Sequence, residues 1–244
     1  MNLVIDIGNS RTKAAIFSKK ELVESFIYDK LSFDQLTDLI KRYPGIDQVI
    51  LSTVSLVDQD VLYYLKSKFS FFLELNHQTP VPMQIDYLTP ETLGLDRVAA
   101  AIGARKLFPG KDLLVIDTGT AVTFDLVERN GTFAGGNISP GLRSRFRALH
   151  EFTQKLPLVE EGDQYPLIGK TTEEAIRSGV VNGMILEIDG TIDLLKKKLP
   201  ELQPVLTGGD AQFFERRLKS PIFVKFEITL IGLNRILEYN VEKP

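Results

Sequence analysis

Short apolar runs alternate with amphipathic segments along this chain, and the same order of elements occurs twice. In the first half, residues 2–17 predict two strands joined by a tight turn, and further strands are predicted at 21–29, 48–53 and 71–75. Helical spacing is found at 32–42, where Ser32 is a plausible N-cap, and at 58–69 and 94–108. In the second half, strands are predicted at 113–117, 122–128, 132–138, 204–207 and 222–225, and helices at 142–150, 171–199, 210–218 and 229–239. Alternating strands and helices predict an α/β fold, and the repeated order predicts two related halves, 1–111 and 112–244.

Three parts of the chain depart from this alternation. Pro80, Pro82 and Pro90 predict an extended connection. Residues 151–170 form the one long irregular stretch, which we expect to be a surface excursion or a dimer contact. The long helix at 171–199 contains three glycines, and we expect an interruption or a bend near one of them: Gly179, Gly183 or Gly190.

The composition narrows the range of functions. A chain of 244 residues can bury a substantial core, as one large or two smaller domains. A formal charge of -3 gives no support for a nucleic-acid partner. The absence of cysteine excludes disulfides and thiolate metal sites. No segment approaches the roughly 20 apolar residues that span a bilayer, so we expect a cytoplasmic protein with no membrane partner.

Two copies of one short motif carry the clearest chemical signal. Asp6 and Asp117 each end an apolar run, and each is followed by one other residue, then by a glycine and then by small polar residues. Gly8 and Gly119 allow the backbone to approach a ligand, so that amide N–H groups can contact phosphate oxygens. A single Asp–Gly turn is common, but two of them about 110 residues apart predict a clamp for ATP and its magnesium.

Three further segments admit both a functional and a structural interpretation. The run Thr207-Gly208-Gly209-Asp210 either lets adenosine lie on the backbone or forms a turn with Asp210 as N-cap. Asp96 and Arg97 form either a base with an anion-binding arginine, or an N-cap with a surface arginine. The Gly-rich loop at 135–141 either lines the ligand cleft or makes a tight packed turn.

Together these motifs resemble type III pantothenate kinases over nearly the whole chain. The resemblance is carried by DIGNSRTK at 6–13, GLDR at 94–97, DTGTAVTFD at 117–125, GGNISPGL at 135–142, TTEEAIRSG at 171–179 and TGGDA at 207–211. The G-x-D-R pattern separates this family from other members of the acetate kinase, sugar kinase, heat-shock chaperone and actin superfamily. The resemblance implies an α/β fold of duplicated ribonuclease-H-like (actin-like ATPase) domains, with an ATP cleft between the two halves.

The resemblance also implies roles for individual residues. Asp96 is implied to be the general base for the primary hydroxyl of pantothenate. ATP contacts are implied for Asp6, Ile7, Gly8, Asn9, Ser10, Arg11, Thr12, Lys13 and Thr120, and we add Gly208 and Gly209 for adenosine. Pantothenate contacts are implied for Tyr87, Gly94, Leu95, Asp96, Arg97 and Thr172. Asp117 is implied to bind a monovalent cation, K⁺ or NH₄⁺, and we expect Asp6 to hold Mg²⁺ through water.

Two residues depart from the family pattern: Ser10 replaces the usual Thr but keeps a hydroxyl, and Thr171 stands where Asn is frequent. The expected activity is ATP-dependent phosphorylation of pantothenate to 4′-phosphopantothenate, the first step of coenzyme A biosynthesis, by a homodimer. One alternative is another small-molecule kinase of the superfamily, against which GLDR argues. The other is a non-catalytic nucleotide-binding regulator, against which the complete set of Asp6, Asp96 and Asp117 argues.

Overall fold

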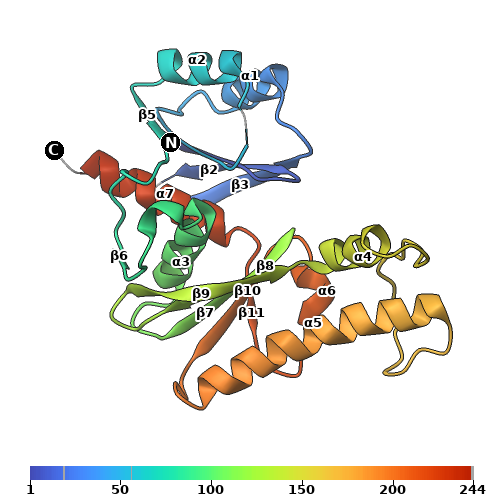
Figure 1. Ribbon diagram of the computed structural model, residues 1–244. Coiled ribbons are helices and arrows are strands. Elements are labelled where there is room, and N and C mark those ends of the chain that lie inside the picture. The colour runs from blue at the N-terminus through green and yellow to red at the C-terminus, as the bar shows by residue number, and fades with distance from the viewer. Residues whose placement is uncertain (19, 56, 243–244) are drawn as a thin grey trace. The chain divides into compact units, whose positions relative to one another are not determined.

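The computed structural model describes residues 1–18, 20–55 and 57–242, which fold into two compact units (Figure 1). Unit 1 contains Met1–Pro109, Gly131–Phe133 and Glu227–Pro244. Unit 2 contains Gly110–Asn130 and Ala134–Phe226. Every helix in the described ranges is too short or too polar to cross a membrane.

Unit 1 is built on a five-stranded sheet in the order β3-β2-β1-β4-β5. The strands are β1 (Asn2–Ile7), β2 (Thr12–Ser18), β3 (Glu21–Tyr28), β4 (Gln48–Thr53) and β5 (Phe71–Glu74). β1 pairs antiparallel with β2 and parallel with β4, so the carboxyl ends of β1 and β4 lie side by side. Polar side chains at these two strand ends are thereby brought together.

Helices cover the sheet of unit 1. The apolar faces of α1 (Phe33–Arg42) and α2 (Gln59–Lys68) join a buried cluster with side chains of β1, β2 and β4. α7 (Ile228–Glu242) contacts the same three strands, and α3 (Leu95–Leu107) packs on α7. These two helices approach very closely, since a Cβ added to Gly232 would lie 1.7 Å from the carbonyl oxygen of Ala99. A methyl group cannot be accommodated at that distance, so the α3–α7 contact requires glycine there.

Unit 2 repeats the topology of unit 1. Its strands are β7 (Leu113–Thr118), β8 (Ala121–Val127), β9 (Thr132–Pro140), β10 (Gln203–Thr207) and β11 (Phe223–Val224), in the order β9-β8-β7-β10-β11. As in unit 1, the first strand pairs antiparallel with the second and parallel with the fourth. The first residues of β9 belong to unit 1, where they pair with the short strand β6 (Gln84–Ile85). The matching strand orders support a duplication.

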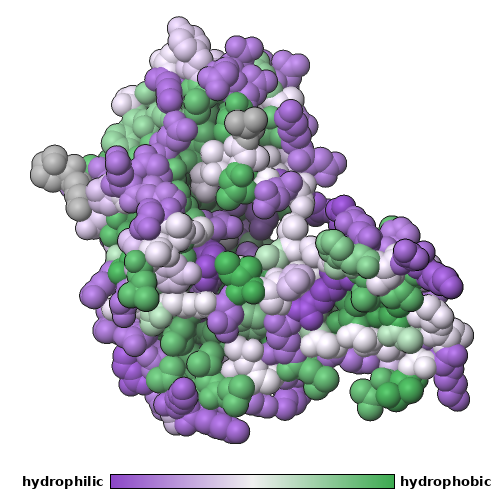
Figure 2. All heavy atoms as spheres, in the orientation of Figure 1, coloured by the Kyte–Doolittle hydropathy of each residue, from purple (hydrophilic) through white to green (hydrophobic). Residues whose placement is uncertain are grey.

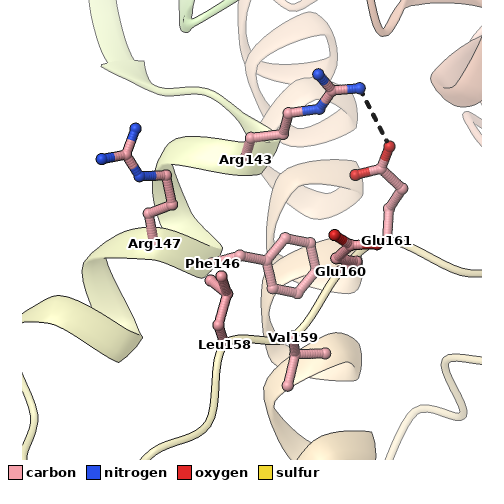
Figure 3. Close-up of a pocket in the computed structure, with 7 residues that line it drawn as sticks. All are labelled: Arg143, Phe146, Arg147, Leu158, Val159, Glu160 and Glu161. Carbon is pink, nitrogen blue, oxygen red and sulfur yellow. Dashed lines mark ion pairs between the residues drawn. The ribbon is translucent and has the colours of Figure 1, made fainter.

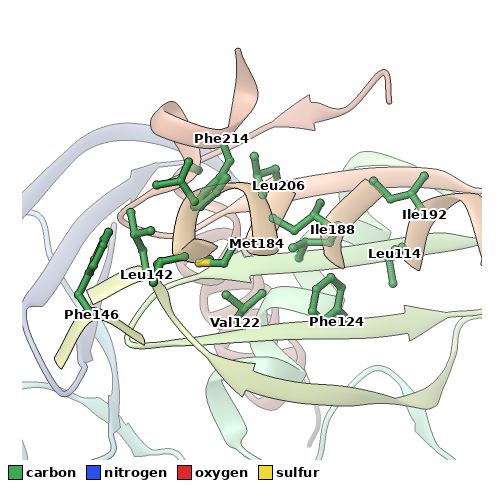
Figure 4. Packing of buried hydrophobic residues seen from close by; sticks show 14 of the residues in the cluster. Leu114, Val122, Phe124, Leu142, Phe146, Met184, Ile188, Ile192, Leu206 and Phe214 are labelled. Carbon is green, nitrogen blue, oxygen red and sulfur yellow. The ribbon is translucent and has the colours of Figure 1, made fainter. Parts of the chain in front are cut away.

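The core of unit 2 lies between its sheet and its helices, α4 (Leu142–Glu151), α5 (Thr172–Lys196) and α6 (Ala211–Glu215). Figure 4 shows side chains of α5 packed against strand residues, and those labelled include Leu114, Val122, Phe124, Met184, Ile188 and Ile192. Each large apolar side chain buried in this way contributes about 1.5–3 kcal/mol. This burial is the main stabilising contribution to unit 2.

Most predicted elements are confirmed within a few residues at their ends. Ser32 caps α1 as predicted, because its side chain accepts a hydrogen bond from the backbone N–H of Gln35. Two predictions were incomplete: the extended proline-rich connection also contains β6 and a short 3₁₀ helix, Pro90–Thr92. The helix predicted at 210–218 is shorter, Ala211–Glu215.

The expected interruption of the long helix was wrong, since α5 runs without a break from Thr172 to Lys196. A Cβ at Gly179, Gly183 or Gly190 would meet no atom within 4 Å, so these glycines lie on the open side of the helix. Each glycine costs about 1 kcal/mol in a helix interior. Burial of the opposite face, including Val181, outweighs that cost.

The compact units do not follow the order of the chain. α7 is the last element in sequence, yet it packs in unit 1 on β1, β2 and β4. The halves predicted at 1–111 and 112–244 remain a prediction about the duplication. The compact units differ from these halves, because α7 packs its apolar side chains against unit 1.

Candidate active site

The first Asp–Gly loop of unit 1 connects β1 to β2. The N–H of Gly8 donates a 3.0 Å hydrogen bond to the carbonyl of Arg11, which closes the turn. Asn9 and Ser10 lie exposed at its tip, whereas Thr12 is buried as β2 begins. The loop is therefore a fixed turn that presents polar residues to solvent, as expected for a site that receives a polar ligand.

Asp6 lies at the centre of a small polar cluster beneath this loop. It pairs with Lys13 across the β1–β2 ladder and with Ser52 across the β1–β4 ladder. Burial raises the pKa of Asp6 from 3.8 to about 6; the Lys13 ammonium opposes this rise, the nearby charge of Asp96 adds to it, and a hydrogen bond from the Ser52 side chain opposes it. Because its ionised form is disfavoured in this way, the carboxylate is stabilised when a cation binds beside it.

Asp96 lies in the first turn of α3, where its Oδ1 accepts a 2.9 Å hydrogen bond from the backbone N–H of Arg97. The N-cap residue is Gly94, and a Cβ there would lie 2.6 Å from Asp96 Oδ1. The structural alternative for this pair, an Asp96 N-cap with a surface arginine, is therefore wrong. Arg97 is 7% exposed, so its side chain is held in the unit rather than solvated.

Two of the predicted acceptor-binding residues of unit 1 contact the same aromatic ring. Tyr87 and Arg97 both contact Phe133, which is fully buried on β9. Leu95 follows Gly94 as the first residue of α3. Tyr87, Arg97 and Asp6 thus all belong to unit 1, together with Asp96.

The second Asp–Gly loop, in unit 2, is held by hydrogen bonds to its backbone. The N–H of Gly119 donates to the carbonyl of Ala121 at 3.0 Å. The carbonyl of Thr120 accepts from the N–H of Gly141 at 3.0 Å and from the Ser144 hydroxyl at 2.7 Å. The start of α4 therefore fixes the loop that contains Thr120.

Glycines allow three segments of unit 2 to meet at this loop. A Cβ at Gly141 would lie 2.1 Å from the carbonyl oxygen of Gly119, which is the close packing of the structural alternative for segment 135–141. The interpretation of this segment as a loop was wrong for residues 135–140, because they continue strand β9. Gly208 has φ +99°, and a Cβ there would lie 2.5 Å from Asp117 Oδ1. The N–H of Asp210 donates to the carbonyl of Thr118 at 3.0 Å.

The TGGDA segment is thus packed directly on the second Asp–Gly loop. Its strand, β10, lies next to β7, with Thr207 opposite Asp117. Asp210 stands at the N-cap position of α6 but makes no side-chain cap hydrogen bond. Gly208 is needed for backbone contact with Thr118, so this glycine serves close packing whichever ligand the loop binds, whereas a Cβ at Gly209 would meet no atom within 4 Å.

Thr172 is the first residue of α5 and is exposed. Thr171, the departure from the family pattern, caps this helix by accepting a 3.1 Å hydrogen bond from the N–H of Glu174. The Glu174 side chain in turn accepts from the N–H of Lys170 at 2.8 Å. Thr171 therefore still caps the helix, and Thr172 remains the first residue of α5.

A separate pocket of about 390 Å³ lies in unit 2 between α4 and residues 158–161 (Figure 3). Buried Phe146 and Val159 line it together with the ion pair of Arg143 and Glu161, whose charged atoms are 3.5 Å apart. None of the residues predicted to bind ATP or pantothenate lines this pocket. We therefore assign it no part in the reaction.

Sequence reasoning missed Ser52, Ser144 and Phe133. Ser52 follows an apolar run near the end of β4. This position at a strand end is the one sequence signal that could have indicated a place near Asp6, which lies opposite Ser52 in the sheet. Ser144 and Phe133 carry no local signal, because their contacts depend on packing between elements distant in sequence.

The raised pKa predicts that Asp6 destabilises the ligand-free protein above about pH 6. Folding raises this pKa, so the folded state favours the protonated carboxyl, and stability is lost as pH rises from about 4 to about 6. Asp6→Asn should therefore raise the free energy of unfolding by roughly 2 kcal/mol at pH 8 and by little at pH 4.

Thermal or urea unfolding at both pH values measures this difference, with the exposed Asp29→Asn as the matched control. A gain that is equal at pH 4 and pH 8, or a loss at pH 8, would contradict the burial of an ionised Asp6.

Comparison with known proteins identifies the family. The family model "Type III pantothenate kinase" matches residues 2–194. The type III pantothenate kinase of Phocaeicola vulgatus is 49% identical over 240 residues, covering 98% of this chain and 99% of that protein. The type III pantothenate kinase of Bacteroides fragilis strain ATCC 25285 is 47% identical over 240 residues, covering 98% of each.

Solved structures share the fold at lower sequence identity. The activator of 2-hydroxyisocaproyl-CoA dehydratase from Clostridium difficile, solved with bound ADPNP, has a TM-score of 0.53 and 13% identity, covering 100% of this chain and 98% of that one. The ROK hexokinase of Thermus thermophilus has a TM-score of 0.52 and 14% identity, covering 98% and 99%. The predicted actin-like α/β fold is confirmed, and the chain belongs to the type III pantothenate kinase family.

Proposed function

We propose that this kinase phosphorylates the primary hydroxyl of pantothenate with Asp96 as general base. The activity of the family is ATP-dependent phosphorylation of pantothenate in coenzyme A biosynthesis, and this chain is an alcohol-group phosphotransferase of that kind. The observation that carries the assignment to Asp96 is its place at the start of α3, close enough to raise the pKa of Asp6. A base and a cation-binding carboxylate are thus neighbours in unit 1.

The chain's own residues supply positioning and charge. Asp96 accepts the hydroxyl proton as the oxygen attacks the γ-phosphorus of ATP and ADP leaves. Lys13 adds a positive charge beside Asp6 for the phosphates. We assign the other ATP contacts to backbone and side chains of Asp6–Thr12, to Thr120, and to Gly208 and Gly209 for adenosine.

Pantothenate contacts are assigned to Tyr87, Gly94–Arg97 and Thr172. Arg97 is suited to the carboxylate of pantothenate, because a guanidinium binds carboxylates through two parallel hydrogen bonds. The hydrogen bond between Asp96 and the N–H of Arg97 places the base next to this anion-binding group. One end of the acceptor is thereby held while its hydroxyl meets Asp96.

The residues present fit a magnesium ion near Asp6. No group of three His, Cys, Asp or Glu side chains among the described residues forms a metal cluster. Mg²⁺ does not require one, because it keeps several waters and binds one or two carboxylates plus substrate phosphates. Held by Asp6 through water, it would neutralise charge on the ATP phosphates.

Asp117 is the assigned ligand of a monovalent cation. Its Oδ1 lies 2.5 Å from the position that a Cβ would take on Gly208 and 3.2 Å from the position that a Cβ would take on Gly119. These two glycines leave the carboxylate accessible to a small ion. A K⁺ or NH₄⁺ ion there would offset part of the phosphate charge.

Replacing Asp96 by Asn tests the assignment of the base. The amide cannot accept the hydroxyl proton, so kcat should fall by about 10²-fold or more, whereas ATP affinity should change little. Initial rates of phosphopantothenate formation and a nucleotide-binding titration measure the two effects.

Glu91→Gln is the matched control, since Glu91 is an exposed carboxylate in the 3₁₀ helix before α3. Near-wild-type turnover of folded Asp96→Asn protein would show that another group accepts the proton.

We also propose that the protein is a homodimer, and the open face of α5 supports a surface for it. Leu186 and Leu194 are 67% and 63% exposed, and the three open glycines share their side of the helix. Before α5, Leu167 and Ile168 are 79% and 76% exposed, and Figure 2 shows hydrophobic atoms gathered beside that end of the helix.

The charges of α5 favour an antiparallel pair. Glu173 and Glu174 lie in its first turn, whereas Lys196 lies in its last turn and is followed by Lys197 and Lys198. Two copies related by a twofold axis would place the acidic end of each helix near the basic end of the other. The glycines would allow the two backbones to approach.

Leu186→Lys should therefore convert the dimer to a monomer, because a charged side chain would be buried in the contact. Size-exclusion chromatography with light scattering measures the mass. Tyr63→Lys, which removes a large exposed side chain from α2, should leave the dimer intact. A dimer that survives Leu186→Lys at low protein concentration would place the contact elsewhere.

A further inference from the structure

Phe133 contacts two side chains of unit 1 that are assigned to pantothenate, Tyr87 and Arg97. It is 0% exposed, at the second position of β9. Its ring centroid lies 6.2 Å from that of Tyr87, with the ring planes at 68°. The Cζ atom of Arg97 lies 5.9 Å from the same centroid. One buried ring therefore contacts both side chains at once.

The main chain of Phe133 also fixes the segment that leads to Tyr87. In the β6–β9 pair, Ile85 lies opposite Phe133. The N–H of Asp86 then donates a 2.9 Å hydrogen bond to the carbonyl of Phe133. Tyr87 is the next residue, so both its backbone and its ring are positioned by a single residue of β9.

A phenyl ring is suited to holding an arginine that must bind an anion. The face of the ring attracts the guanidinium through the negative potential of its π electrons. Because phenyl has no oxygen or nitrogen, it orients the guanidinium without accepting any of its N–H hydrogen bonds. The edge-to-face contact with Tyr87 is a favoured arrangement of two aromatic rings. An aliphatic residue of similar size would fill the space but provide neither interaction.

We propose that Phe133 is the positioning residue of the acceptor site and sets the orientation of Arg97 and Tyr87 toward the carboxylate of the acceptor, an inference that rests on the proposed function. Phe133 acts through these two side chains and does not touch the reacting atoms. Its loss weakens binding of an anionic acceptor. Binding of ATP and the proton transfer at Asp96 do not depend on it.

The test is steady-state kinetics of Phe133→Leu, which retains an apolar side chain but removes the aromatic face. KM for pantothenate should rise about tenfold or more, while KM for ATP stays within about twofold. The rise should be smaller for a neutral acceptor in which an amide replaces the carboxylate. Phe133→Tyr keeps the aromatic face, so its KM for pantothenate should stay within about threefold of the wild type.

Phe124→Leu is the matched control for a general loss of packing. Phe124 is also a buried phenylalanine on a neighbouring strand, 3% exposed, but it belongs to the core of unit 2. It should lower thermal stability without changing KM for pantothenate. In the background of Arg97→Met, the further change Phe133→Leu should have much less effect on KM than it has alone.

The inference would be overturned by an unchanged KM for pantothenate in Phe133→Leu, by an equal rise in Phe124→Leu, or by an equal rise in Phe133→Tyr. A parallel rise in KM for ATP would also contradict it, since that points to disturbance of the whole unit. Failure of the proposed function is distinguishable, because the wild-type protein would then fail to phosphorylate pantothenate at all.

Discussion

The desolvation of Asp6, a half-buried carboxylate near the end of β1, is the constraint on which the proposed chemistry depends. Asp6 is held among Lys13, Ser52 and the nearby charge of Asp96, in an environment that raises its pKa to about 6. Keeping it ionised at neutral pH costs free energy in the ligand-free protein. Under the proposed assignment, a cation bound with ATP beside Asp6 would remove that cost and so contribute to nucleotide affinity.

Unit 2 supports its loop by close backbone packing instead of by buried charge. The loop after β7 is bound by N–H groups from the start of α4 and from Asp210, and two glycines, Gly141 and Gly208, permit the contacts. Any side chain at these two positions would collide with backbone atoms of the loop. The backbone of Thr120 is therefore held in one position, which suits a residue assigned to bind phosphate.

The sequence predicted what depends on local pattern. The Asp–Gly hairpins, the Ser32 cap and the family motifs were all recognisable because neighbouring residues define them. Phe133 and Ser52 could not be found in this way, since their roles depend on pairing between strands that are distant in the chain. The uninterrupted course of α5 was also beyond local reasoning, because burial of its inner face outweighs the glycines on its outer face. Strand β6 has only two residues, which is too short for an alternation of apolar and polar side chains to predict it.

We propose that this pantothenate kinase binds a monovalent cation at its second Asp–Gly loop. ADP release from ATP and Mg²⁺, measured with and without pantothenate and in potassium or sodium salts, tests it most directly. We predict ADP release that requires pantothenate and is faster in potassium. Folded, ATP-binding protein that releases no ADP with pantothenate in either salt would contradict the account.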